Sequence, residues 1–426
     1  MEDVKMRKEF FKGNRRRMYQ EMKPHSLLVM FSGREVRKTS DEYYPFYTDR
    51  NFLYLTGLEG KEFILLVRKD SESEINEKIY MLPPDLLKER WTGERMKPGQ
   101  VEETSGIGNF GYVEEFETDF HKLASVGNYQ YLYLDVYKED TDDGDLPAHR
   151  LLSKAAKVYP YLRIENANAI VRSLRTIKQP CEIEAMREAE KITREGITAM
   201  MKASRPGMYE YQYKAVFDYT LGQYGPQGPA FPSIISAGKN NFCIHYYSYT
   251  GQAQDGDMVL NDVGAWHDHL MNDVSRGWPC NGRYNEKQRR LYECALKTSN
   301  HMFGMIKPGM PMAEVDAEIR RYNALMLKEA GVLKNVEEIG TYMWHGGAHH
   351  VGFDVHDAIK QPEVIAPGMV FCVDVGIYHE EWGIGFRLED NCLVTEDGCE
   401  NLSVITPRTI AEIEDTMKKG YYAASI

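Results

Sequence analysis

Four acidic residues interrupt otherwise apolar segments in the second half of this 426-residue chain. Asp262 lies in Met-Val-Leu-Asn-Asp-Val, Asp273 in Leu-Met-Asn-Asp-Val, Asp374 in Val-Phe-Cys-Val-Asp-Val and Glu389 in Gly-Phe-Arg-Leu-Glu. A carboxylate inside an apolar strand is costly unless it is paired or binds a metal ion. The four segments are therefore expected to be buried strands that contribute to one metal site.

The first two acids are expected to lie on a hairpin. Residues 258–264 read as one strand and residues 269–276 as its antiparallel partner. Asp262 and Asp273 would then face each other, where two like charges repel unless a cation lies between them.

A glycine-rich loop and a basic residue accompany these acids. Residues 345–352 read His-Gly-Gly-Ala-His-His-Val-Gly, and this loop is permissive enough to bring imidazoles close to a metal. Spacing alone leaves open whether His349 or His350 points inward. Arg387 and Glu389 lie two residues apart and are expected on one face of a strand.

Oxygen-rich ligation with a single imidazole suits manganese, cobalt or zinc. Two such ions about 3.5–4 Å apart can share carboxylates, acidify a bridging water and polarise a carbonyl. The residues therefore indicate a peptidase-like or amidase-like metal centre. Taken singly, each acid also fits a strand edge or a turn cap, and Arg387 also fits a structural ion pair with Glu389.

The length of the chain predicts two domains. Strands and helices alternate up to about residue 168, and apolar residues at helical spacing follow Pro180. We expect an α/β (α+β) fold with domains at residues 1–172 and 173–426.

Charge and composition bear on partners and location. A net charge of −12 argues against a nucleic-acid partner. The apolar runs fall far short of the about 20 residues that cross a membrane, and the N-terminus has no apolar signal core. Seven scattered cysteines without a Cys-x-x-Cys pair predict reduced thiols in the cytoplasm.

Several ordered motifs resemble those of the pita-bread metallopeptidases, and specifically of the Xaa-Pro aminopeptidases (aminopeptidase P). In the second half they are residues 238–246, 257–265, 272–276, 345–349, 352–357, 367–370 and 385–390. In the first half, residues 11–15 and 49–57 resemble the N-terminal domain of aminopeptidase P and prolidase. The resemblance covers nearly the whole chain and implies an N-terminal α/β domain followed by a pita-bread catalytic domain.

The resemblance also implies roles for individual residues. Five residues fall on ligand positions for two divalent metal ions, manganese first, with cobalt or zinc as alternatives: Asp262, Asp273, His349, Asp374 and Glu389. Asp273 and Glu389 would bridge the ions, and a metal-bridging hydroxide would attack the carbonyl before proline. Further catalytic positions are His245, His345 and His356, which orient the peptide and stabilise the tetrahedral intermediate, and Arg387, which holds the ligand carboxylates.

One position departs from the family pattern. Where the family has Glu-Pro-Gly, this chain has Asp374-Val375-Gly376, and the family's glutamate is also a candidate general base. The leading prediction is an aminopeptidase that acts on peptides with proline second and assembles as a homodimer or homotetramer. The alternatives are a prolidase, an impaired metal-binding or protein-binding relative favoured by Asp374, and last a creatinase-like amidinohydrolase.

Overall fold

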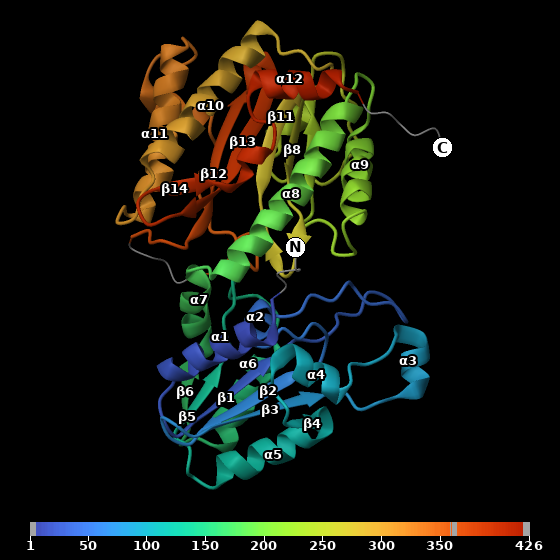
Figure 1. Ribbon diagram of the computed structural model, residues 1–426, viewed down its shortest axis with the longest axis vertical. Helices are drawn as coiled ribbons and strands as arrows, with labels where there is room; N and C mark the ends of the chain where they lie inside the picture. The colour runs from blue at the N-terminus through green and yellow to red at the C-terminus, as the bar shows by residue number, and fades with distance from the viewer. Residues whose placement is uncertain (1–5, 358, 360–363, 421–426) are drawn as a thin grey trace. The chain divides into compact units, whose positions relative to one another are not determined.

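The computed structural model describes residues 6–357, 359 and 364–420 (Figure 1). The chain divides into two compact units, Met6–Arg175 and the residues from Thr176 onward. The boundary predicted from the sequence, between residues 172 and 173, lies three residues before this division. None of the described helices combines the length and the apolar character needed to span a bilayer.

The N-terminal unit is built on one mixed sheet with the strand order β4-β3-β2-β1-β5-β6. Its strands are β1 (Ser26–Phe31), β2 (Ile64–Lys69), β3 (Ile75–Met81), β4 (Phe110–Tyr112), β5 (Tyr131–Leu134) and β6 (Arg163–Asn166). Its helices are α1 (Lys8–Glu21), α2 (Arg50–Thr56), α3 (Leu86–Thr92), α4 (Pro98–Ser105), α5 (Val113–Ser125), α6 (Pro147–Val158) and α7 (Ala167–Thr176). Strands predicted from the apolar runs at residues 63–67 and 131–136 are present as β2 and β5.

The C-terminal unit holds the predicted metal-binding segments. Its strands are β7 (Ile234–Ala237), β8 (Met258–Val263), β9 (Trp266–His267), β10 (Leu270–Met271), β11 (Val274–Pro279), β12 (Val370–His379), β13 (Ile384–Val394) and β14 (Cys399–Asn401). Its helices are α8 (Pro180–Ala203), α9 (Glu210–Gly222), α10 (Glu286–Met305), α11 (Met312–Glu329) and α12 (Ile410–Lys418). Short 3-10 helices are η1 (Gly238–Phe242), η2 (Val336–Thr341), η3 (Glu380–Trp382) and η4 (Leu402–Ile405).

The predicted helix after Pro180 is confirmed as α8. Pro180 occupies its first turn, where a missing N–H costs nothing, and the Glu182 side chain accepts the backbone N–H of Gln179 at 2.8 Å. Apolar residues at helical spacing, including Met186 and Ile197, are buried along one face. This helix therefore follows from local capping and from the burial of its apolar stripe.

The predicted hairpin is present, but its register differs from the expected one. Strand β11 pairs antiparallel with β8, and Ser275, rather than Asp273, lies opposite Asp262. Asp273 lies two residues away from that position, just before β11 begins, because the two-residue turn at Asp268 and His269, both with positive φ, sets one register for β9–β10 and β8–β11. The expectation that the two acids face each other directly was wrong. They are diagonal neighbours, which still places them on the same face.

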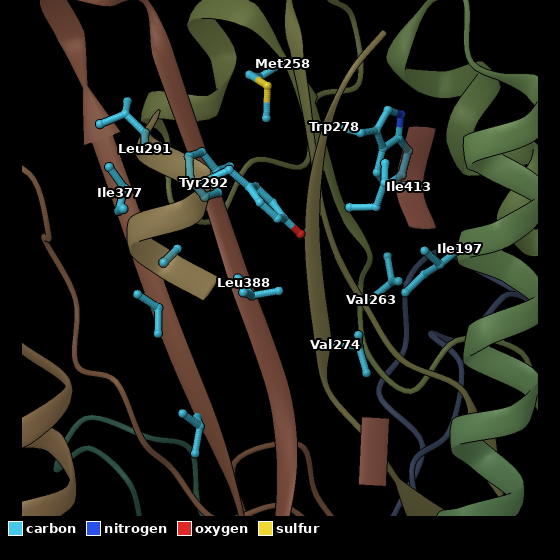
Figure 2. Close-up of a cluster of buried hydrophobic side chains, with 14 of the residues drawn as sticks. Ile197, Met258, Val263, Val274, Trp278, Leu291, Tyr292, Ile377, Leu388 and Ile413 are labelled. Carbon is cyan, nitrogen blue, oxygen red and sulfur yellow. The ribbon is translucent and has the colours of Figure 1, made fainter. Parts of the chain in front are cut away.

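The core of this unit lies between the strands and the surrounding helices. Figure 2 shows Trp278 from β11, Tyr292 from α10, Leu388 from β13 and Ile413 from α12, each fully buried. Figure 1 shows helices on both sides of the central strands of this unit. Since every residue of β8, β11, β12 and β13 is buried, a polar side chain on these strands has little access to solvent.

Candidate metal centre

The four predicted acids lie on or beside strands whose pairing brings them together. Asp374 on β12 is paired directly with Glu389 on β13. Asp262 is the next-to-last residue of β8, and Asp273 precedes β11. All four are buried. Two segments separated by about a hundred residues of chain therefore meet at one group of carboxylates.

Three of these acids form a group that we call the carboxylate cluster: Asp262, Asp273 and Glu389. One oxygen of each lies within 4.8 Å of the oxygens of the other two. Among the described residues, Oδ1 of Asp262 and Oδ1 of Asp273 have no hydrogen-bond partner. Buried oxygens without a donor are costly, and oxygen donors are what hard divalent cations prefer. The residues therefore fit a metal ion.

Burial and mutual repulsion control the charge of these acids. Burial raises the pKa values of Asp273 and Glu389 well above their usual range, and neighbouring carboxylates raise them further. Burial raises the pKa of Asp374 to about 8 against the opposing effect of Arg387. A bound cation reverses this effect because it stabilises ionised ligands. Metal binding would therefore release protons that Asp273 and Glu389 retain to higher pH than ordinary carboxyl groups do.

A second group, the histidine–thiol cluster, consists of His349, Cys372 and Glu389, whose ligand atoms also lie within 4.8 Å of one another. Nδ1 of His349 is 3.4 Å from the carbonyl oxygen of His350, which favours a proton on Nδ1 and a lone pair on Nε2. That Nε2 is 3.5 Å from Asp273 Oδ2 and 3.7 Å from Glu389 Oε1. Burial lowers the pKa of His349 to about 4, so its neutral ring can bind a cation.

Asp374 lies outside both clusters and contacts a different histidine. Its Oδ2 is 3.2 Å from Nδ1 of His345, while its Oδ1 has no hydrogen-bond partner in the described part of the chain. The same Nδ1 is 2.8 Å from the carbonyl oxygen of Gly346, so the proton of the neutral ring belongs on Nδ1. Nε2 then accepts the hydroxyl hydrogen of Tyr378 at 3.0 Å. His345 is thus oriented through both ring nitrogens.

Arg387 joins this histidine to the carboxylate cluster. Its Nη2 donates to Asp262 Oδ2 at 2.7 Å, and its Nη1 donates to the hydroxyl oxygen of Tyr378 at 2.9 Å. A Cβ at position 376 would clash with the ring of His345, so Gly376 makes this close approach possible. The buried guanidinium therefore orients one candidate ligand directly and the histidine through a tyrosine.

Two further predicted histidines lie on the exposed side of the cluster. His245 and His356 are both exposed. The ring centroid of His356 is 4.0 Å from that of His349. Burial of part of its ring, together with the charge of His245, lowers the pKa of His356. These two imidazoles are therefore placed to contact a molecule that approaches the metal ligands.

Two polar side chains hold the ligands from the strands themselves. The hydroxyl of Ser275 donates to Glu389 Oε2 at 2.8 Å. The amide of Asn391 accepts the backbone N–H of Asp273 at 3.3 Å and donates to the carbonyl oxygen of the same residue. Such contacts restrict ligand geometry before a metal ion arrives.

Comparison with known proteins agrees with this geometry. Residues 184–396 match the model of metallopeptidase family M24, and residues 11–133 match the aminopeptidase P N-terminal domain. The Xaa-Pro aminopeptidase of Haemophilus influenzae is 31% identical, over 97% of this chain and 98% of its own length. A Bacillus anthracis structure described as an aminopeptidase P has 32% identity and a TM-score of 0.95, and the match covers 98% of this chain and 100% of that one. Aminopeptidase P of Escherichia coli, solved with the inhibitor Pro-Leu, has 26% identity and a TM-score of 0.90, over 97% and 99% of the two chains.

The chain belongs to metallopeptidase family M24. Its fold is the predicted one, an aminopeptidase P N-terminal domain followed by a pita-bread catalytic domain. It is a metallo-aminopeptidase of the aminopeptidase P type, and membership of the family implies bound divalent metal ions.

Three residues that contact the predicted site residues were not predicted from the sequence: Ser275, Cys372 and Tyr378. A signal for two of them was present in the chain. Cys372 and Tyr378 stand two residues before and four residues after Asp374, and side chains at even spacing share one face of a strand. Ser275 could not be found in this way, because its contact with Glu389 depends on how β11 and β13 meet.

Glu190 on α8 is a buried acid outside both clusters, and we expect it to make the stability of the enzyme depend on pH. Its Oε1 accepts a hydrogen bond from Ser403 at 2.9 Å, and burial raises its pKa from 4.5 to about 8. A raised pKa stabilises the fold fully below pH 4.5, and this contribution is lost as the pH rises to about 8. We expect Glu190→Gln to melt several degrees above the parent enzyme at pH 8, with the difference vanishing toward pH 4.5.

The matched control is Glu188→Gln on the same helix. Glu188 is exposed and its Oε1 lies 2.6 Å from Lys191 Nζ, so its removal should cause no pH-dependent difference. Calorimetry of the metal-loaded proteins across this pH range makes the comparison. A difference in melting temperature between Glu190→Gln and the parent that stays the same at every pH would contradict the role of Glu190 ionisation.

Proposed function

We propose that this enzyme releases the N-terminal residue from peptides that carry proline in the second position, using two divalent metal ions. The carboxylate cluster, with its unpartnered buried oxygens, is the observation that carries this proposal. The whole-length likeness to an Xaa-Pro aminopeptidase supports the choice of substrate. An oxygen-rich donor set with one imidazole favours manganese, with cobalt or zinc as alternatives.

The proposal keeps the five predicted ligands. Asp262, Asp273 and Glu389 hold one cation, and His349 with the shared Glu389 holds the other. Asp374 is the fifth ligand, because its unpartnered Oδ1 lies on the strand face that also carries Glu389. When bound, the two cations supply an activated water and polarise the scissile carbonyl.

The remaining residues position the substrate and the protons. Arg387 holds the carboxylate of Asp262 in place through their 2.7 Å hydrogen bond. His345 presents its Nδ1 proton to Asp374, which is placed to accept a proton in turn. His245 and His356 are exposed and contact the peptide, where they stabilise negative charge that develops on its carbonyl oxygen.

Lengthening Asp374 tests whether the shorter acid limits the reaction. Asp374→Glu adds one methylene and should raise kcat of the manganese-loaded enzyme several-fold, since the longer carboxylate reaches beyond its contact with His345. Steady-state kinetics on one tripeptide, with Asp374→Asn as the comparison that removes the charge, measure this effect. Unchanged or lower activity in Asp374→Glu would show that the site is built around aspartate.

The function is tested by hydrolysis of an Xaa-Pro-Xaa tripeptide after the metal has been stripped and manganese restored, with metal content measured alongside. We expect manganese-dependent release of the first residue only. Cleavage restricted to Xaa-Pro dipeptides would indicate a prolidase instead. Two bound metals without cleavage of either peptide would indicate an impaired, binding relative.

The assembly and the location of the enzyme are also proposals. We propose a homodimer or homotetramer in the cytoplasm, and no nucleic-acid partner on account of the net charge of −12. Sedimentation equilibrium of the purified enzyme measures the number of chains.

A further inference from the structure

Cys372 completes a ligand set that was not predicted from the sequence. Its Sγ, an imidazole nitrogen of His349 and an oxygen of Glu389 all lie within 4.8 Å of one another. Strand β12 points Cys372 to the same side as Asp374, and the pairing partner of Asp374 on β13 is Glu389. Glu389 therefore belongs to two three-residue clusters, and in the second of them the third donor is a sulfur.

The hydrogen bonds of Cys372 differ from those of other cysteines in this unit. The thiols of Cys280 and Cys294 donate to backbone carbonyl oxygens, at 2.9 and 3.4 Å. Sγ of Cys372 instead accepts the backbone N–H of His349 at 3.3 Å, and its own N–H donates to the carbonyl oxygen of His349 at 2.8 Å. The sulfur of Cys372 is thus held by the backbone of the histidine that carries the candidate ligand nitrogen.

A second observation points to a cation at this place. Oδ1 of Asp273 and Oδ1 of Asp374 are more than nine-tenths buried and have no hydrogen-bond partner among the described residues.

We propose that Cys372 is a sixth metal ligand, which donates its sulfur to the cation held by His349 and Glu389. The S–H bond breaks as the metal–sulfur bond forms, and the proton passes to solvent, with no change of oxidation state. A soft donor shifts the preference of this position toward thiophilic cations such as zinc, cobalt and cadmium, relative to manganese. This inference rests on the proposed function for the presence of the metal centre.

A structural explanation makes a different prediction. Buried cysteines commonly act as small apolar residues that fill space, and Cys392 on β13 provides the matched case. Cys392 is paired with Phe371, so it lies on the opposite face of the sheet from Cys372. A purely packing role predicts that alanine at either position leaves metal binding alone.

The test removes the metal from the full-length enzyme and reloads it with cadmium or with cobalt. The near-ultraviolet absorption of each reloaded enzyme is then recorded. We expect a thiolate-to-metal charge-transfer band in the parent and in Cys392→Ala, and its loss in Cys372→Ala and Cys372→Ser. The affinity for cadmium should fall about tenfold or more in both Cys372 variants, and the affinity for manganese should fall less. X-ray absorption of the unmodified zinc-loaded enzyme tests for the sulfur ligand without a variant. We expect it to show a sulfur at about 2.3 Å from zinc.

The outcomes separate this inference from the proposed function. Two bound cations and cleavage of the tripeptide, with no charge-transfer band and no sulfur near zinc, would overturn the role of Cys372 and leave the function standing. A band that Cys372→Ala removes, in an enzyme that cleaves no proline peptide, would support the ligand and overturn the function. A band that persists in Cys372→Ala would assign the signal to another thiol and overturn the inference.

Discussion

Replacing Glu389 with alanine is expected to strip the bound metal and to lower kcat/KM for an Xaa-Pro-Xaa peptide roughly a thousandfold or more. Glu389 is the one residue common to the two candidate clusters of the described chain, so its loss removes a donor from both cations. The cations contribute several kcal/mol to the stabilisation of transition-state charge, and about 4 kcal/mol corresponds to a thousandfold in rate. Metal analysis of the purified variant and steady-state kinetics measure the two effects. Asp273→Ala should act in the same direction.

The control variant is Glu400→Ala, an acid on the neighbouring strand β14 whose carboxylate is bound to Arg187 rather than to either cluster. It should keep both the metal content and the turnover of the parent. Full activity with two metals in Glu389→Ala would remove Glu389 from the ligand set.

When no metal is present, removing the charge of Glu389 should stabilise the enzyme. Burial and the neighbouring carboxylates raise the pKa of Glu389, so its ionisation destabilises the metal-free enzyme as the pH rises above the usual glutamate value. Glu389→Gln keeps the shape and removes that ionisation. At pH 8 the metal-free variant should therefore melt above the metal-free parent, and the metal-loaded parent should melt above both.

His356→Ala is expected to lower kcat roughly a hundredfold, the cost of losing one donor to transition-state charge, while the metal content stays that of the parent. His356 is exposed, and it reaches the site through its ring contact with His349 rather than through the carboxylates. We therefore propose that His356 contacts the substrate and not a metal ion. Steady-state kinetics and metal analysis of the same sample distinguish contact with the substrate from binding of a metal ion.

A matched control for this variant is His267→Ala. His267 lies on β9, is half-buried and belongs to neither cluster. Its removal should leave both kcat and metal content unchanged. If His356→Ala instead loses metal, His356 is a ligand or holds one, and its assignment to the substrate is wrong.

Much of the fold could be predicted from local patterns. The helix that begins at Pro180 followed from a proline, a capping residue and apolar residues at helical spacing, which act over a few residues of chain. Strands β2 and β5 followed from continuous apolar runs. These signals come from residues that are close together in the chain, so the helix and the two strands could be predicted without tertiary contacts.

The register of the hairpin could not be read in the same way. The sequence allowed Asp262 to face Asp273, whereas the structure places Ser275 opposite Asp262. The difference arises because the hairpin turns at Asp268 and His269, and this turn sets the register that β9–β10 and β8–β11 share. Register depends on where the chain turns and on what each face buries.

The sequence by itself determined the two-domain organisation, the family and the acids that we propose as metal ligands, because a carboxylate in a buried strand is costly unless it is paired or binds a cation. Only the tertiary structure decided which donors share a cluster. It set Asp374 against His345, Tyr378 between His345 and Arg387, and Cys372 beside His349. These are contacts between strands and a loop that are far apart in the chain, and their distances depend on packing rather than on any local pattern.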